Sequence, residues 1–128
     1  MLSLLFGPDG TTLYAGDSLG HVHKIVQGKL QELFKVHSGP VGALAYDYKD
    51  SLLLAAGGRT NSKKLKKVRL VQGQDKREEA KVVGSVRLHH SPIALDFYKG
   101  RVAVGLKDGS ILVIETDGRQ KKVMQSHS

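Results

Sequence analysis

Two histidines at alternate positions have the spacing best suited to metal chemistry in this sequence. His21 and His23 lie two apart in the apolar segment HVHKIV, so on a strand their side chains would share one face. Asp17 lies four residues before His21, on an expected turn, and both carboxylate and imidazole groups bind zinc. No further ligand of suitable type follows at close spacing. We therefore interpret the pair as surface residues of a strand and expect neither a metal nor another cofactor.

Catalytic chemistry has no local signature in the chain. Adjacent carboxylates occur only at Glu78 and Glu79, within a charged stretch. Gly57 and Gly58 lead into an expected strand, whereas a phosphate-binding loop would lead into a helix and carry a lysine at its start. Serine, histidine and aspartate are present, but no motif marks one of them as a nucleophile or its base. The sequence therefore predicts a non-catalytic protein.

A run of cations is the third chemical feature. Six positive charges fall within eleven residues that contain no acid, namely Arg59, Lys63, Lys64, Lys66, Lys67 and Arg69. One interpretation is contact with an acidic partner, because clustered surface lysines attract anions in a salt-dependent way. The other is a solvated edge strand, whose lysines oppose pairing with a strand of another molecule. Nucleic-acid binding is disfavoured, because no aromatic residue lies within the run to stack on a base.

Turn signals around these residues occur twice. The segment Gly16–Gly20 follows a short apolar run and precedes an alternating one, and Gly105–Gly109 does the same near the C-terminus. In both segments the two glycines are four apart, and they suit turn positions that need a positive φ. Asp108 directly before Gly109 is a strong hairpin signal. The two segments are therefore predicted to be equivalent hairpins of a repeated unit.

The spacing beyond these hairpins also agrees. Gly28 precedes His37 by nine residues, and Gly118 precedes His127 by nine. Apolar strands begin near residues 2, 41 and 93, at spacings of 39 and 52. A β-propeller blade of four antiparallel strands takes about 40–45 residues, so the second unit would carry insertions. The sequence predicts one all-β domain, a partial propeller of three four-stranded antiparallel blades over residues 1–37, 38–90 and 91–128.

Three blades do not close a propeller ring. Closed rings use about four to eight blades, and each blade relies on its neighbours for a core. We therefore expect the remaining blades to come from a longer chain or from assembly. Two local expectations accompany this fold. Leu2–Phe6 is a buried strand, and Gln72–Ala80 is a charged loop. Within that loop Asp75–Ala80 has the length of one helical turn but lacks the apolar stripe that would support a helix.

Composition excludes several classes of protein. The chain has 128 residues, 40% hydrophobic and 25% charged, as is typical of one soluble globular domain. Its apolar runs are too short to cross a bilayer, so we expect no membrane association. It has no cysteine, which excludes a disulfide framework and is compatible with the cytoplasm. The net charge of +8 comes largely from the cationic run, which favours an acidic partner at one patch.

These features resemble those of WD-repeat propellers. In that family a histidine closes the connection between blades and an aspartate lies in the middle hairpin. The matching histidines are His37, His89 or His90, and His127, and the matching aspartates are Asp17 and Asp108. The chain has no tryptophan, so the Trp-Asp dipeptide that names the repeat is missing, and the hydrogen-bond network built on that tryptophan cannot form.

More narrowly, the chain is similar to the echinoderm microtubule-associated-protein-like family. The segments that carry the similarity are, in order, Leu2–Phe6, Gly16–Gly20, His37–Val41 with Ala43-Leu44, Gly57-Gly58, Ser91–Ile93 and Val104-Gly105. The resemblance implies three blades of a first propeller in a protein that binds tubulin and microtubules, without the family's coiled coil and hydrophobic motif. It implies a cytoplasmic, cytoskeleton-associated scaffold. The alternative is a WD-repeat adaptor for another protein complex, with no cytoskeletal role.

Overall fold

Every described element of the protein is a β-strand. The computed structural model describes residues 2–75, 77–115 and 120–125. Its strands are β1 (Ser3–Phe6), β2 (Thr12–Gly16), β3 (His21–Val26), β4 (Lys29–Lys35), β5 (Val41–Asp47), β6 (Leu52–Gly57), β7 (Lys64–Gln72), β8 (Glu78–Arg87), β9 (Pro92–Tyr98), β10 (Arg101–Leu106), β11 (Ser110–Ile114) and β12 (Gln120–Gln125). They form three four-stranded antiparallel sheets, which we call the first (β1–β4), middle (β5–β8) and third (β9–β12) sheets.

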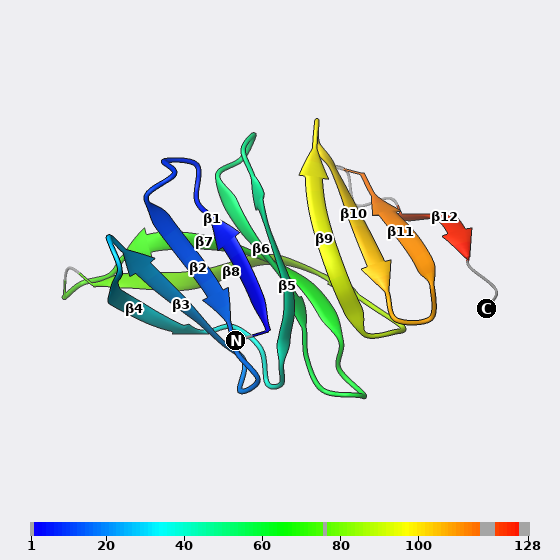
Figure 1. Ribbon diagram of the computed structural model, residues 1–128, viewed down its shortest axis with the longest axis horizontal. Coiled ribbons are helices and arrows are strands. Elements are labelled where there is room, and N and C mark those ends of the chain that lie inside the picture. The colour runs from blue at the N-terminus through cyan, green and yellow to red at the C-terminus, as the bar shows by residue number, and fades with distance from the viewer. Residues whose placement is uncertain (1, 76, 116–119, 126–128) are drawn as a thin grey trace.

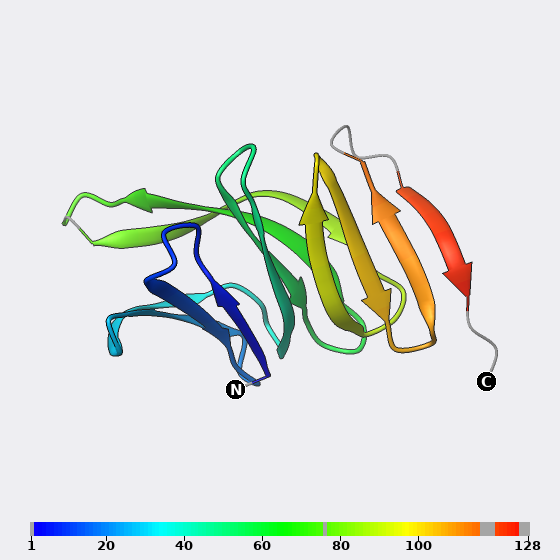
Figure 2. The same cartoon turned by 45° about the horizontal axis from the view of Figure 1, so that its top comes forward.

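The three sheets stand side by side with their first strands together. Strand β5 packs between β1 and β9, as Figures 1 and 2 show, while β4, β8 and β12 are the far edges of their sheets. This is the arrangement of neighbouring propeller blades, and the described strands do not close a ring. The prediction of an all-β chain with three four-stranded blades and an incomplete ring is therefore confirmed. Within the described ranges, no helix is long and apolar enough to cross a membrane.

The middle sheet is covered on both faces, and β6 shows this most clearly. All six residues of β6 are buried. Because side chains alternate along a strand, Leu53 and Ala55 pack toward the first sheet, whereas Leu54 and Ala56 pack toward the third. A short, continuously apolar strand is what a strand buried on two sides requires.

The first interface lies between the first and middle sheets and combines an apolar core with polar bridges. Its core includes Tyr14, Val22, Phe34, Val41, Leu53 and Val68. The Ser3 hydroxyl donates a hydrogen bond to the Val41 carbonyl oxygen at 3.0 Å. Lys24 of β3 forms an ion pair with Glu78 of β8. Lys66 Nζ of β7 donates to the carbonyl oxygen of Val36 at 2.7 Å. Each of these bonds fixes the position of the middle sheet relative to the first sheet or to the linker that follows it.

The second interface lies between the middle and third sheets and rests on apolar packing. Its core includes Leu54, Leu65, Leu88, Val104, Leu106 and Ile114. Leu95 and Phe97 of β9 pack against this cluster while partly buried. Full burial of a leucine or valine side chain contributes roughly 1.5–3 kcal/mol, so these residues account for a large part of the cohesion between the two sheets.

Strand β1 differs from the expected buried strand. Ser3 and Leu5 face the middle sheet, but Leu4 and Phe6 are 65% and 63% exposed. The prediction that Leu2–Phe6 is buried is therefore wrong for one of its two faces. The reason is that alternate side chains of β1 point away from the middle sheet, to a face that no described strand covers.

The charged segment after β7 also differs from expectation. Residues 78–80 belong to β8, where Glu79 pairs with Val71, and Gly73 N donates to Arg77 O to close the turn. The charged loop is therefore shorter than the predicted Gln72–Ala80, because residues 78–80 pair with β7 as part of β8. Strand β7 is paired with both β6 and β8, so it is not the edge strand that one interpretation of the cationic run required.

Candidate functional site

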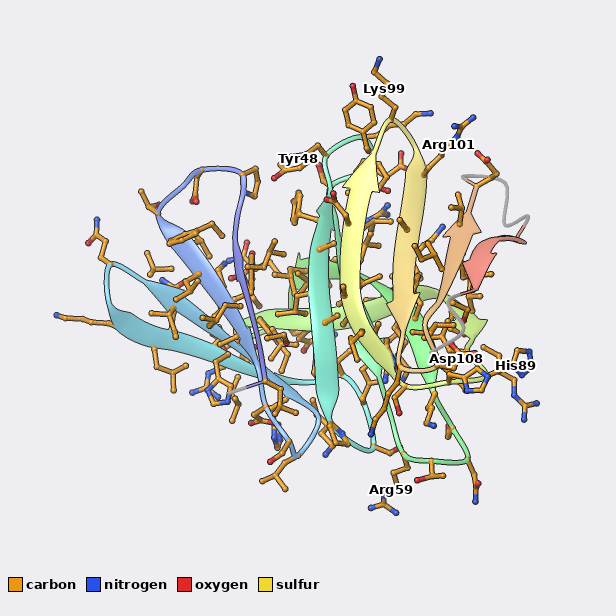
Figure 3. The ribbon with its side chains drawn as sticks, turned by 45° about the vertical axis from the view of Figure 1, so that its right-hand side comes forward. Tyr48, Arg59, His89, Lys99, Arg101 and Asp108 are labelled. Atoms are coloured by element: carbon orange, nitrogen blue, oxygen red, sulfur yellow. The ribbon has the colours of Figure 1, made fainter. Side chains whose placement is uncertain are left out.

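The hairpins and linkers divide into two groups at opposite ends of the sheets. One end, here called the linker end, comprises residues 17–20, 36–40, 58–63, 88–91 and 107–109. The opposite end comprises residues 7–11, 27–28, 48–51, 73–77 and 99–100, of which residue 76 is not described. In Figure 3, Arg59, His89 and Asp108 lie toward the first end, and Tyr48, Lys99 and Arg101 lie at the second. Several residues singled out in the sequence, among them Asp17, His37 and Asp108, belong to the linker end.

At the first hairpin of this end, Asp17 gathers the two nearby histidines. Its Oδ1 accepts hydrogen bonds from the backbone amides of Leu19 and His21, both at 2.9 Å. Its Oδ2 lies 2.8 Å from His23 Nε2 and 3.6 Å from His21 Nδ1. Burial raises the pKa of Asp17, but the hydrogen bonds from His23 and the two amides outweigh it and lower the pKa to about 2. The carboxylate therefore orders the hairpin as an anion.

The group formed by Asp17, His21 and His23 is poorly suited to holding a metal ion. Among the described residues, Asp17 has ion-pair contacts with His21 and His23, and it already accepts two backbone hydrogen bonds. Within residues 2–75, 77–115 and 120–125, no group of three or more histidine, aspartate or glutamate side chains is arranged to hold a metal ion. The contacts that these three residues make are contacts of a closed hairpin.

The two glycines of each hairpin have different structural roles. Gly20 and Gly109 have positive φ values of 94° and 91°. Gly16 and Gly105 do not, so the prediction of positive φ is wrong for them; both lie within strands. At Gly16 a Cβ would lie 2.4 Å from Ser3 Oγ and 2.7 Å from Val41 Cγ1, so glycine allows the middle sheet to approach. At Gly105 a Cβ would make ordinary contacts, since Ala94 Cβ would be 3.5 Å away.

His37 lies in the first linker and is buried, with 3% of its surface exposed. Its Nε2 lies 2.9 Å from the carbonyl oxygen of Ala55 in β6. Burial lowers the pKa of His37 and outweighs the hydrogen bond to Ala55 O, which raises it; the nearby positive charges of Lys66 and Lys64 lower it further. The imidazole is thus held neutral at the junction between the first linker and the middle sheet.

In the second linker Leu88 is the equivalent of Val36. The backbone amides of Val36 and His37 both donate to Gly20 O, and the amide of Leu88 donates to Lys63 O. Val36 and Leu88 each follow directly on the last residue of the fourth strand, and that residue pairs with the first residue of the third strand. Both are buried, at 5% and 4% exposure. Aligned in this way, the linkers are 52 residues apart, and His89 takes the position of His37, which is one of the two positions that the sequence pattern allowed.

His89 and His90 are both exposed. His90 Nε2 lies 3.2 Å from Asp108 Oδ2, so it contacts the third hairpin rather than the middle sheet. Asp108 also accepts hydrogen bonds from the backbone amide and the hydroxyl of Ser110. Asp17 and Asp108 thus close equivalent hairpins with different partners. His127 lies outside the described residues.

The structure divides the cationic run into three groups. Arg59 and Lys63 lie in the β6–β7 loop, Lys64 and Lys66 face the first sheet, and Lys67 and Arg69 face the other side of the middle sheet. Cross-strand partners share a face, and Lys66 pairs with Ala55 whereas Lys67 pairs with Leu54. Burial lowers the pKa of Lys66, whose ammonium bonds to Val36 O. The six cations do not form one patch, and their contact with an acidic partner stays a prediction.

The β6–β7 loop, residues 58–63, is the longest hairpin loop at the linker end and is flanked by two hollows. An open hollow of about 650 Å³ lies against Pro40 and Ser91, and a second of about 350 Å³ lies against Arg87 and His89. Arg87 also belongs to this surface, although no sequence pattern marks it. It lies opposite Lys64, directly beside the loop, and this pairing appears only in the folded chain.

Comparisons with known proteins bear on the fold. No protein-family model matches the chain, and no curated protein matches it in sequence. Solved structures do match. The WD40 β-propeller domain of Doa1 has a TM-score of 0.72 at 19% identity, over 98% of this chain and 40% of that one.

Two further crystal structures are similar to the same degree. The β-propeller domain of Myceliophteria thermophila Cps50 (Swd1) has a TM-score of 0.70 at 17% identity, over 94% of this chain and 38% of that one. Saccharomyces cerevisiae Sqt1 has a TM-score of 0.70 at 16% identity, over 93% of this chain and 34% of that one. The chain therefore spans about two fifths or less of these solved chains. Its fold is that of consecutive blades of a WD40 β-propeller.

Proposed function

We propose that this chain is part of a non-catalytic β-propeller scaffold that binds other proteins at its linker end. A fold alone does not define a function, so the proposal rests on the site. The observation that carries it is the β6–β7 loop, which backbone hydrogen bonds from Gly58 to Pro40 O and from Leu88 to Lys63 O fix between two linkers. A loop held in this way presents Arg59 and Lys63 in a fixed position, which lowers the entropy cost of binding.

As the partner we propose tubulin in microtubules, with the protein in the cytoplasm on the cytoskeleton. The support for this is the resemblance to the echinoderm microtubule-associated-protein-like family, together with the exposed cation Arg59 and half-buried Lys63 in the loop. Acidic tubulin tails would be attracted to such cations in a salt-dependent way. The test is co-sedimentation of the full-length protein with microtubules that keep or lack their acidic tails. Binding should fall when the tails are removed; absence of binding at low salt would exclude this partner.

The second candidate is an adaptor for another protein complex, without a cytoskeletal role. The division of the cationic run favours it, because Lys66 is engaged with Val36 O and Lys64 faces the first sheet. Charge reversal of Lys67 and Arg69, which face the opposite side, separates the two candidates. If microtubule binding through the whole run is right, this variant should bind microtubules less well; an adaptor that uses only the linker end should be unaffected.

The first and third sheets each have one face that no described strand covers. For these two faces we propose further propeller blades, from a longer chain or from a second copy. Leu4 and Phe6 are exposed on β1, and the equivalent faces of the middle sheet are buried. Light scattering on residues 1–128 tests this. We expect association or poor folding, whereas a soluble monomer that unfolds cooperatively would contradict the proposal.

A further inference from the structure

The β6–β7 loop forms a ridge between the two hollows of the linker end. Thr60, Asn61 and Lys63 line both hollows. The larger hollow is also lined by Arg59 and Ser62, and the smaller by Arg87 and His89. A ligand that lay across the ridge would therefore reach cations on both sides of it.

The charged side chains that line the two hollows are cations. The lining residues supply three permanent cations and four hydroxyl or amide side chains, namely Arg59, Lys63, Arg87, Thr60, Asn61, Ser62 and Ser91. Among the described residues that line the two hollows there is no aspartate, glutamate, phenylalanine or tyrosine. Strong hydrogen-bond donors without a competing carboxylate are what an anionic group requires. With no phenylalanine or tyrosine, and with His89 as the single aromatic ring among these lining residues, the surface is poorly suited to single-stranded nucleic acid, which is held largely by base stacking on aromatic side chains.

The backbone fixes the ridge. Ser62 N donates to Arg59 O at 2.9 Å, so Thr60 and Asn61 are the central residues of a closed turn. Gly58 has a φ of +113°, and a Cβ there would lie 2.1 Å from Ser62 O, so only glycine lets the loop fold back on itself. Arg59 Nε donates to Ser38 O at 3.0 Å, which orients the guanidinium along the linker. The polar side chains of the turn are thus carried by an ordered backbone.

We propose that this ridge and its two hollows bind a phosphorylated serine or threonine in a segment of a partner protein. A phosphate monoester carries about −1.5 to −2 charges at neutral pH and three strong acceptor oxygens, which matches the guanidinium, ammonium and hydroxyl donors that line the two hollows. A carboxylate has one charge and two oxygens, so it would use fewer of these donors. The inference rests on the proposed role as a protein-binding scaffold, but it does not depend on tubulin as the partner.

The test measures binding of short fluorescent peptides to the full-length protein. Each peptide carries one central phosphoserine or phosphothreonine among randomised neighbours, and matched sets carry serine, threonine or glutamate at that position. We expect the phosphorylated set to bind at least about tenfold more tightly than the others, with affinity falling as salt rises. The double variant Arg59→Glu/Lys63→Glu should lose this binding.

The matched control reverses two charges away from the ridge. Lys49 and Lys81 are exposed, in the β5–β6 turn and in β8, so Lys49→Glu/Lys81→Glu changes net charge equally and should bind phosphopeptides normally. Circular dichroism checks that both variants fold. Equal binding of glutamate peptides, equal loss in the control variant, or preference for single-stranded RNA over phosphopeptides would each overturn the inference. Microtubule co-sedimentation of the unmodified protein is measured in parallel, so the two proposals fail separately. Absence of phosphopeptide binding refutes only the ridge inference, and absence of microtubule binding refutes only the tubulin proposal.

Discussion

The first interface joins its two sheets through an apolar core and side-chain bridges from Ser3, Lys24 and Lys66, whereas the second interface packs leucine and valine side chains around Leu65 and Val104. The junction residues follow the same division. At the first junction His37 is buried and bonds to Ala55 O, whereas at the second junction His89, at the equivalent position, is exposed. The two interfaces of the middle sheet therefore differ in their chemistry.

The two interfaces therefore contribute in different ways: one mainly holds its sheets together, and the other mainly fixes their relative position. Apolar contacts are non-directional, so the second interface owes its strength mainly to buried area and shape. Hydrogen bonds and ion pairs are directional, and a buried donor left without its partner costs free energy. The first interface is therefore the more sensitive to the relative position of its sheets, and the second to the volume of its side chains.

The largest effect is expected from emptying the second interface. Leu65 is fully buried there, so Leu65→Ala should lower the free energy of unfolding by about 2–5 kcal/mol through lost packing and a residual cavity. Equilibrium urea unfolding measures this. Leu30→Ala is the control, since Leu30 is 60% exposed on β4, and it should change the free energy of unfolding by less than about 0.5 kcal/mol. Equal effects of the two variants would mean that the second interface does not hold the sheets together.

The next effect concerns the close approach at the first interface. Gly16→Ala places a methyl group against Ser3 Oγ and Val41 Cγ1, and such overpacking should destabilise the protein by roughly 1–3 kcal/mol. Gly105→Ala is the matched control at the equivalent hairpin position, where the added methyl group makes only ordinary contacts. Thermal unfolding compares the two. Similar losses of stability would show that the sheets do not approach more closely at Gly16 than at Gly105.

A pH dependence should belong to the first interface alone. Burial lowers the pKa of His37 below its ordinary value of 6.5 in the folded chain. As pH falls through 6.5 the unfolded chain binds a proton that the folded chain does not, so stability falls until the pH reaches the folded pKa. His37→Gln should remove this part of the slope, and His89→Gln, at an exposed position, should leave it. Unfolding free energies between neutral and mildly acidic pH provide the measurement; an unchanged slope in His37→Gln would assign it elsewhere.

The smallest effect is expected from the ion pair between Lys24 and Glu78. Both side chains are partly exposed, so the coupling energy should be about 0.2–1 kcal/mol. A double-mutant cycle with Lys24→Met and Glu78→Gln isolates that energy, and added salt should reduce it. A coupling much larger than this would make the pair a principal tie between the sheets and sharpen the contrast with the second interface.

The architecture could be predicted from the sequence because it depends on short segments that form turns and strands locally. Gly16–Gly20 and Gly105–Gly109 recur with the same flanking strands, and turn chemistry is local. The exposure of Leu4 and Phe6 could not be predicted, because it depends on which sheets are neighbours and not on the apolar character of β1 itself.

The candidate site was less predictable, because it depends on contacts between distant segments. The number of charges in residues 59–69 does not show how they are distributed in space. Side chains alternate along β7, so Lys66 and Lys67 lie on opposite faces of the middle sheet. The hydrogen bond from Lys66 to Val36 O spans thirty residues and leaves no local signal. The linkers align at the predicted spacing, but the burial of His37 and the exposure of His89 could not be read from the sequence, because they depend on contacts with the neighbouring sheet.

The order of the strands has a consequence for how the protein is made. Each sheet consists of four strands that follow one another along the chain. During synthesis a sheet therefore needs no segment that has yet to leave the ribosome in order to complete its own backbone pairing. Its apolar faces are a different matter: Tyr14 and Phe34 of the first sheet stay uncovered until β5–β8 emerge, and β6 is protected on both sides only after β9 and β10 arrive. The interval between sheets is thus the period in which the nascent chain most needs protection from aggregation.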